Sequence, residues 1–188
     1  PIAIPLVVVF IYCYLTKTLK EMFKPLHSVV GIIIFLLIVM PWHIAMYRDF
    51  GNSFLYEYFF KHHFERLINS NEIGRKHSLF YFIPVFIVAF MPWTIIFLAA
   101  ITDGCKDLIN RFKNAQGKLV EKLMSTLEAK DENQHLILFA SIYFIVTFGV
   151  MSISSTKLPT YILPAIPAAA LLTGYFWCRS YKENKFAL

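Results

Sequence analysis

Long apolar runs alternate with short polar segments along this chain, and the runs have the length of membrane-spanning helices. A bilayer core requires a helix of about 20 mostly apolar residues. We predict five spans, at residues 1–15, 28–46, 79–101, 136–153 and 158–177. The first run is short for a span, so we expect its beginning to lie in a preceding, missing segment. The pattern predicts an all-α integral membrane protein in which residues 1–188 form part of one polytopic domain.

Composition and charge agree with this prediction. Hydrophobic residues make up 57% of the chain and charged residues 16%, whereas about a quarter of a soluble domain is charged. Segments 16–25, 102–135 and 179–188 fall on one side of the predicted spans and carry twelve Lys and Arg residues, against six on the other side. Because cytoplasmic loops are enriched in Lys and Arg, these segments are predicted to be cytoplasmic and the loop 48–78 to face outward. The net charge of +6 has the same origin, so we expect no nucleic-acid partner.

The long cytoplasmic segment 102–135 contains an amphipathic pattern. Leu119, Leu123 and Leu127 recur every four residues, with charged residues between them, as on one face of a helix. We expect a helix that either lies along the membrane surface or packs under the bundle.

The outer loop 48–78 concentrates charged, histidine and aromatic residues, and an amphipathic helix is predicted within it at 54–67. At 100° per residue, Glu57, Lys61 and Glu65 share a solvated stripe, whereas Arg66 falls about 140° from Lys61, on the apolar flank. A guanidinium matches the geometry of a phosphate group. Spacing alone leaves two interpretations open for Arg66: a phosphate binder at the interface, or a side chain whose stem covers apolar surface while its head reaches water.

Histidines in the same loop raise the question of a metal site. His62, His63 and His77 with Glu57 or Glu65 offer metal-ligand chemistry. Neighbouring His62 and His63 point about 100° apart on a helix, so they would not easily share one ion. A metal is therefore the weaker interpretation. His43, beside Pro41 and Trp42, is interpreted as an interfacial histidine.

A second group of candidate residues lies between the last two predicted spans. Pro159 and Pro164 prevent a regular helix there, and irregular backbone at membrane depth occurs where it is buried in protein or lines a cavity. Lys157 and Tyr161, four residues apart, can both reach such a cavity. The alternative is that Lys157 is an ordinary interfacial anchor.

Five motifs occur in an order that resembles a known family. They are P-W-H-I (41–44), F-F-K-H-H-F-E-R-L (59–67), G-R-K-H-S-L-F-Y-F-I-P (74–84), M-P-W-T (91–94) and K-L-P-T-Y-I-L-P (157–164). Together they resemble the bacterial relatives of the protein O-mannosyltransferases, the GT-C glycosyltransferases that include the lipid A aminoarabinose transferase. The K-L-P-x-Y-x-L-P string is the most specific match. In the outer loop, His62, Glu65 and Arg66 match the family pattern, while Lys61, His63 and Leu67 depart from it, and Ser78 replaces a frequent proline.

The resemblance implies a GT-C type fold and transfer of a sugar from a polyprenyl-phosphate donor. The acceptor would be a glycolipid, such as lipid A, or a protein, at the periplasmic face of the bacterial inner membrane. It implies that Arg66 and Lys157 bind the donor phosphate and that His62 and Tyr161 line the cavity. A divalent metal ion at His62 is left open, because some relatives use one.

The resemblance also implies what this chain lacks. The catalytic Asp of the family belongs to an N-terminal half that is missing here, so the general base is not identified and the fragment alone is expected to be inactive. Two other functions fit the residues. A transporter or flippase of lipid-linked sugars would also use broken helices and an intramembrane cation. A structural subunit would tolerate substitution of Arg66 and Lys157.

Overall fold

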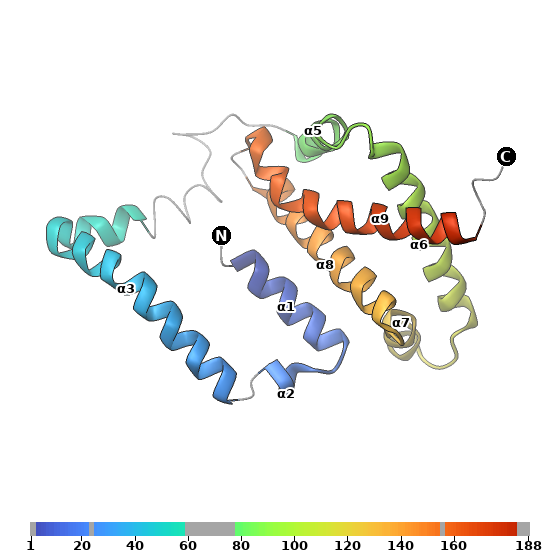
Figure 1. Cartoon of the computed structure of the whole chain (residues 1–188), viewed down its shortest axis with the longest axis horizontal. Helices are drawn as coiled ribbons and strands as arrows, with labels where there is room; N and C mark the ends of the chain where they lie inside the picture. Colours follow the sequence, from blue (N-terminus) through green and yellow to red (C-terminus); the bar gives the residue numbers. More distant parts are fainter. Residues whose placement is uncertain (1–2, 23–24, 59–77, 155–156, 184–188) are drawn as a thin grey trace.

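The computed structural model describes residues 3–22, 25–58, 78–154 and 157–183, and within these ranges the secondary structure is entirely helical. The elements follow the apolar runs of the sequence (Figure 1). They are α1 (Ala3–Leu15), α2 (Leu19–Met22), α3 (Pro25–Leu55), η2 (Leu79–Tyr81), α5 (Phe82–Ala89), α6 (Thr94–Asn114), α7 (Leu119–Leu127), α8 (Glu132–Ile153), η3 (Pro159–Ala165) and α9 (Ile166–Lys182). The predicted all-α fold class is confirmed.

Several helices are long and apolar enough to cross a membrane. In the described part of the chain, three helical stretches meet this requirement, at Val29–Tyr58, Glu132–Ile153 and Pro159–Lys182. A fourth span is possible if the bent pair Leu79–Ala89 and Thr94–Asn114 counts as one, and Ala3–Leu15 is a shorter apolar helix. Helix α3 continues past Met46, where the predicted second span ends, because the following residues keep helical backbone although they are more polar.

The predicted span 79–101 is divided in the structure among a short 3-10 helix and two α-helices with a bend between them. This segment begins with the short 3-10 helix η2. Ser78 caps η2, because its hydroxyl accepts a hydrogen bond from the Phe80 N–H at 3.4 Å. Helix α5 ends at Ala89, and α6 starts at Thr94 with a bend of 119° between them. Pro92 lacks the N–H that a continuous helix would need. The Thr94 hydroxyl donates to the Ile87 carbonyl at 2.8 Å, which satisfies an acceptor at the end of α5.

The polar segment 102–135 is also more helical than its composition indicates. Helix α6 carries the first part of the segment as far as Asn114, and α8 already begins at Glu132. The side chain of Asp131 caps α8 by accepting a hydrogen bond from the Gln134 N–H at 2.8 Å. The predicted amphipathic helix is present between them as α7.

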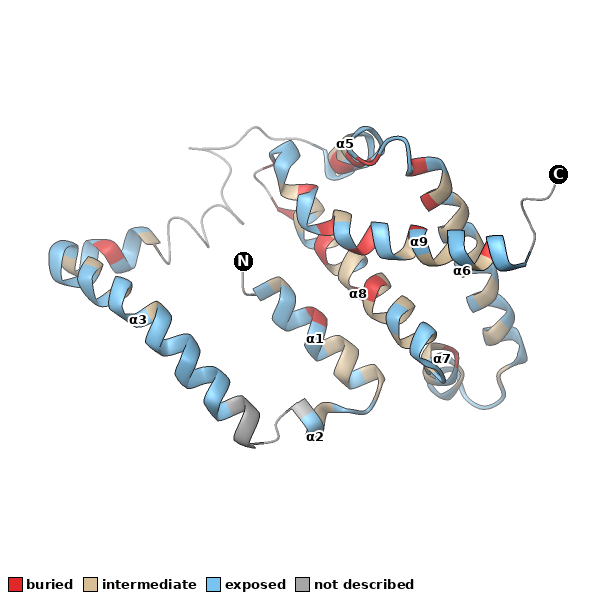
Figure 2. Cartoon of the chain, viewed as in Figure 1, coloured by how far each residue is buried: buried red, intermediate tan, exposed pale blue. Residues whose placement is uncertain are grey.

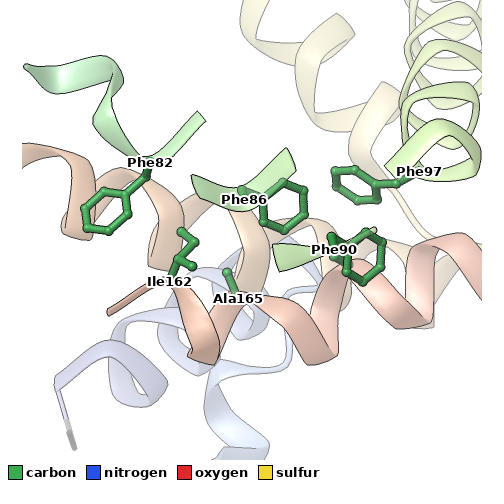
Figure 3. Packing of buried hydrophobic residues seen from close by; sticks show 7 residues of the cluster. Phe82, Phe86, Phe90, Phe97, Ile162 and Ala165 are labelled. Carbon is green, nitrogen blue, oxygen red and sulfur yellow. The ribbon is translucent and has the colours of Figure 1, made fainter. Parts of the chain in front are cut away.

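A cluster of buried apolar residues joins α5, α6, η3 and α9 (Figure 3). Phe86 is its centre: its ring centroid lies 5.3 Å from that of Phe90, 5.2 Å from that of Phe97 and 5.3 Å from that of Phe144 on α8. These distances are typical of favourable aromatic pairs. Because Ile162 belongs to the same cluster, the packing holds η3 against α5 at one end of the bundle.

Helix α3 is different from the rest, because it is exposed along almost its whole length (Figure 2). Leu37 and Ile38 are 70% and 72% exposed. A continuous apolar surface of this kind is unfavourable in water and suits contact with lipid or other membrane helices.

The opposite end of the bundle from η3 carries a polar network. Tyr12 on α1 hydrogen-bonds to His135 on α8 at 3.0 Å, and Arg179 on α9 pairs with Asp103 on α6 at 3.5 Å. Arg111 pairs with Asp107 at 3.0 Å along α6. These contacts bring parts of the segments predicted to be cytoplasmic to the same end of the bundle.

Candidate functional site

The predicted site residues divide into two groups. Arg66 and His62 lie outside the described residues, so their roles stay predictions. Lys157 and Tyr161 are described, and both belong to the K-L-P-T-Y-I-L-P string at the start of the last apolar segment.

Lys157 is buried. Its side chain is 4% exposed, and its Nζ donates a hydrogen bond of 2.8 Å to the Ser154 carbonyl at the end of α8. An interfacial anchor would extend its ammonium into water, so this burial argues against the anchor interpretation. An ammonium has three N–H donors, and the described contact uses one of them. A buried cation of this kind is strongly attracted to an anion, because its own desolvation is otherwise poorly compensated.

The prolines of the string shape the backbone next to Lys157. Leu158 is extended, and Pro159 opens the 3-10 helix η3, which contains Pro164 and gives way to α9 at Ile166. The irregular backbone that the prolines predict is therefore confirmed. The Tyr161 N–H donates to the Leu158 carbonyl at 3.0 Å, which closes the first turn of η3.

Tyr161 is half-buried, and its ring packs against the apolar cluster around Phe82 and Ile162. Ile162 is fully buried, so the register of η3 is fixed by packing. The element η3, which carries Tyr161, contacts α5, α8 and α9, and Lys157 lies two residues before it. A preorganised cation is what electrostatic stabilisation of a developing charge requires.

A cluster of aromatic side chains lies at the far end of α3, and sequence reasoning did not predict it. Trp42, His43, Phe54 and Tyr58 surround one another, with Phe54 and Tyr58 stacked at 5.4 Å between ring centroids. Trp42 lies 5.6 Å from each of these two rings. The His43 Nδ1–H donates to the Val39 carbonyl at 2.9 Å, which fixes the orientation of the imidazole. The expected interfacial histidine is therefore part of an aromatic cluster.

Gly51 makes this cluster possible. Its φ of 57° and ψ of −140° interrupt the helix, and a positive φ is accessible to glycine at little cost. The chain after Gly51 turns back, as the end of α3 shows in Figure 1, so that Phe54 can meet Trp42. The spacing of Trp42, Gly51 and Phe54 was the available signal, but it does not specify the direction of the turn.

An open pocket of about 420 Å³ lies beside the same turn. Its lining combines apolar and aromatic side chains with two hydroxyls and one carboxylate: Met46, Phe50, Ser53, Phe54, Glu57 and Tyr58. Lys157 and Tyr161 do not line it. The described residues contain no group of three His, Cys, Asp or Glu side chains that could hold a metal ion. His62, the candidate ligand, lies outside those residues.

The fold is that of a multi-pass helical membrane protein. At one end of its bundle lie short segments that contain prolines. No family model matches the sequence. The chain is similar to the undecaprenyl phosphate-alpha-4-amino-4-deoxy-L-arabinose arabinosyl transferase of Serratia proteamaculans, with 24% identity over 183 residues. It is 25% identical over 175 residues to the corresponding transferase 2 of Proteus mirabilis. Each match covers 93% of this chain and 27% of the relative.

A solved structure extends the similarity to three dimensions. ArnT from Cupriavidus metallidurans, crystallised with undecaprenyl phosphate, matches 95% of this chain with a TM-score of 0.66 and 28% sequence identity. The match covers 27% of ArnT, so the chain spans about a quarter of the length of the relatives found. The resemblance predicted from the five motifs is confirmed. Over 95% of its own length, the chain has the helical GT-C membrane fold of the matching part of ArnT.

Proposed function

We propose that this chain contributes to a glycosyltransferase that moves a sugar from a polyprenyl-phosphate donor to a lipid A-like or protein acceptor. The observation that carries the proposal is the similarity to ArnT over 95% of the chain, together with the buried Lys157 of the K-L-P-T-Y-I-L-P string. The structure of ArnT contains undecaprenyl phosphate, the product that remains when such a donor has lost its sugar.

The proposed chemistry uses the phosphate as the leaving group. When the bond between the sugar and the phosphate breaks, negative charge grows on the phosphate oxygens. A cation already fixed near those oxygens stabilises the transition state without reorganising. Lys157 is the proposed first cation, because its side chain is buried and its ammonium donates to the Ser154 carbonyl. Arg66 is the proposed second cation, since a guanidinium binds two phosphate oxygens at once. Tyr161 and His62 are the proposed cavity residues.

The proposed site faces the periplasm, at the outer side of the inner membrane. Two features support this orientation. Lys157 and η3 lie at one end of the bundle, and the polar network of Tyr12, His135, Asp103 and Arg179 lies at the other. The second end carries most of the basic residues, as cytoplasmic ends do.

The alternative function, transport of a lipid-linked sugar, has one supporting observation. The break between α5 and α6, with its bend of 119°, is the kind of discontinuous helix that transporters place at their binding sites.

One experiment separates the two functions. The full-length protein is reconstituted in proteoliposomes with polyprenyl-phosphate donors that carry a labelled sugar, and lipid A and peptide acceptors are supplied in parallel. Label bonded covalently to an acceptor supports the transferase and identifies the acceptor class. Label that crosses the bilayer on an intact donor supports transport instead.

A further inference from the structure

The open pocket at the end of α3 has a lining that suits an organic cation. Its volume of about 420 Å³ lies within the range of small-ligand sites, roughly 300–1,000 Å³. The carboxylate of Glu57 lines it together with the rings of Phe50 and Tyr58 and the thioether of Met46. An ammonium group is attracted both to a carboxylate and to aromatic rings. No Lys, Arg or His is among the described lining residues, so the pocket offers a phosphate no positive partner.

The Glu57 carboxylate is available to such a ligand. Its side chain is exposed, and in the described part of the chain no Lys, Arg or His side chain forms an ion pair with it. Asp49, on the same helix, is also exposed but does not line the pocket. Glu57 is therefore the charge that a bound cation would meet, and Asp49 is its natural control. Lys61, one helical turn after Glu57 in the sequence, lies outside the described residues, so the experiment includes it.

The pocket lies at the depth of lipid headgroups. The apolar helical stretch Val29–Tyr58 has 30 residues, whereas the hydrocarbon core of a bilayer takes about 20. Helix α3 contains no Asp, Glu, Lys or Arg before Arg48, which marks where the core ends. The turn at Gly51 keeps the following residues close to this boundary, because the ring of Phe54 lies 5.6 Å from that of Trp42. Aromatic side chains are typical of this interfacial depth.

A lipid can reach the pocket along α3. The helix is exposed over almost its whole length in the described chain (Figure 2), and Phe50, which lines the pocket, is 61% exposed. An acyl chain that lies against the apolar part of α3 places its headgroup at the level of Phe50 and Glu57. This geometry favours the headgroup of a lipid over an amine dissolved in water.

We propose that this pocket binds the ammonium headgroup of a zwitterionic phospholipid, with Glu57 as its charge partner and Phe50 and Tyr58 as aromatic walls. A primary ammonium, as in phosphatidylethanolamine, fits better than a quaternary one. It donates hydrogen bonds to the Glu57 carboxylate and to the Ser53 hydroxyl, whereas a quaternary ammonium has no N–H. The proposal uses the membrane placement of α3 and is independent of sugar transfer, so either can fail without the other.

The test uses the full-length protein in vesicles of phosphatidylcholine and phosphatidylglycerol that contain a trace of photoactivatable lipid. This probe has a diazirine on its acyl chain, next to the glycerol, and an unmodified headgroup of either ethanolamine or choline. After illumination, mass spectrometry measures the labelling of the peptide that covers residues 46–58. The labelling around Ile145 on α8, whose side chain is 67% exposed, measures general contact with lipid, and each value is divided by it.

We expect the ethanolamine probe to label residues 46–58 at least about threefold more than the choline probe, as suits an ion pair in an open site. The ratio between the two probes is taken within each variant, so a change in the chemistry of labelling cancels. Glu57→Gln, which keeps the size and removes the charge, should abolish the preference, and Asp49→Asn should retain it. Phe50→Leu should lower the labelling by both probes about two- to fivefold, because it removes a cation–π contact at an exposed site.

Five results would each overturn the proposal. Equal labelling by both probes means that the contact is not selective for the headgroup. A preference that survives Glu57→Gln means that another group selects the lipid. Absence of labelling at 46–58, with normal labelling around Ile145, means that protein covers the pocket. A preference that appears only in Lys61→Met means that the lysine already neutralises the carboxylate. Absence of labelling around Ile145 means that the membrane placement itself fails.

Discussion

Replacing Lys157 by methionine separates its role in donor binding from its role in the fold. Methionine keeps most of the length of the side chain and removes the charge. The variant loses the hydrogen bond of 2.8 Å to the Ser154 carbonyl, which contributes about 1.5–3 kcal/mol because its donor is charged. It also removes a cation that is 4% exposed and whose desolvation is unfavourable. These two effects oppose each other, so we expect the free energy of unfolding to change by less than about 1 kcal/mol.

Donor use should change far more than stability does. A hydrogen bond to a charged group contributes about 1.5–3 kcal/mol. If the Lys157 ammonium holds the donor phosphate in the transition state, its loss lowers kcat/KM for the lipid-linked sugar by about 10- to 150-fold. A larger share of the loss in kcat than in KM would indicate that the contact strengthens as charge develops on the phosphate.

The assay measures initial rates of sugar transfer by full-length Lys157→Met in proteoliposomes, over a range of donor concentrations. Lys182→Met is the matched control, because Lys182 is exposed at the end of α9. The control should keep wild-type kinetics. Wild-type kcat/KM in Lys157→Met, with normal insertion and stability, would refute the reasoning and leave Lys157 as a structural residue.

Three further substitutions test other parts of the structure. Arg66→Ala in the full-length protein should abolish transfer without loss of membrane insertion, and unchanged turnover would remove Arg66 from the mechanism. Phe86→Ala should lower stability by about 3–5 kcal/mol, as truncation of a packed aromatic residue does; thermal unfolding in detergent measures this, and Phe80→Ala, at a position 70% exposed, should change it little. Arg179→Gln removes two partly exposed pairs, with Asp103 and with Glu183, and should cost less than about 2 kcal/mol; a larger loss would mean that the contacts at that end are cooperative.

The sequence predicts those features of the fold that local physics decides. Uncharged runs of span length indicate helices, because a backbone in lipid must satisfy its own hydrogen bonds. The helices α8 and α9 lie where two of these runs predict them. The prolines at 159 and 164 predict irregular backbone, and η3 is found there. The hydropathy pattern is less informative about the residues at which each helix ends. It marks where apolar residues stop, whereas α3 continues past Met46 to a kink at Gly51 and ends at Leu55.

Features that depend on the direction of the chain in space were not predictable. Pro92 could kink a span slightly or break it, since membrane helices tolerate proline when neighbouring groups satisfy the freed carbonyls. The hydroxyl of Thr94 fulfils this role here, and the outcome is a bend of 119°. In the same way, Gly51 permits a turn but does not specify one, so the contact between Trp42 and Phe54 is a result of the fold.

The burial of Lys157 was only partly predictable from the sequence. Its spacing from Tyr161 suggested that both residues reach one cavity, but an interfacial anchor fitted the sequence equally well. The burial of Lys157 against the Ser154 carbonyl argues against the anchor, and its place in a donor cavity stays a prediction. The neighbouring contact of η3 with α5 joins segments far apart in the sequence, and local patterns do not predict such contacts.

The most direct test of the central claim is the stoichiometry of a single turnover. The full-length protein is given a donor labelled separately in its sugar and in its polyprenyl phosphate, together with lipid A. We predict that one polyprenyl phosphate is released for each sugar that becomes bonded to the acceptor, and that both amounts fall together in Lys157→Met. Donor recovered intact in the opposite leaflet, with no free polyprenyl phosphate and no modified acceptor, would contradict the transferase and establish a transporter.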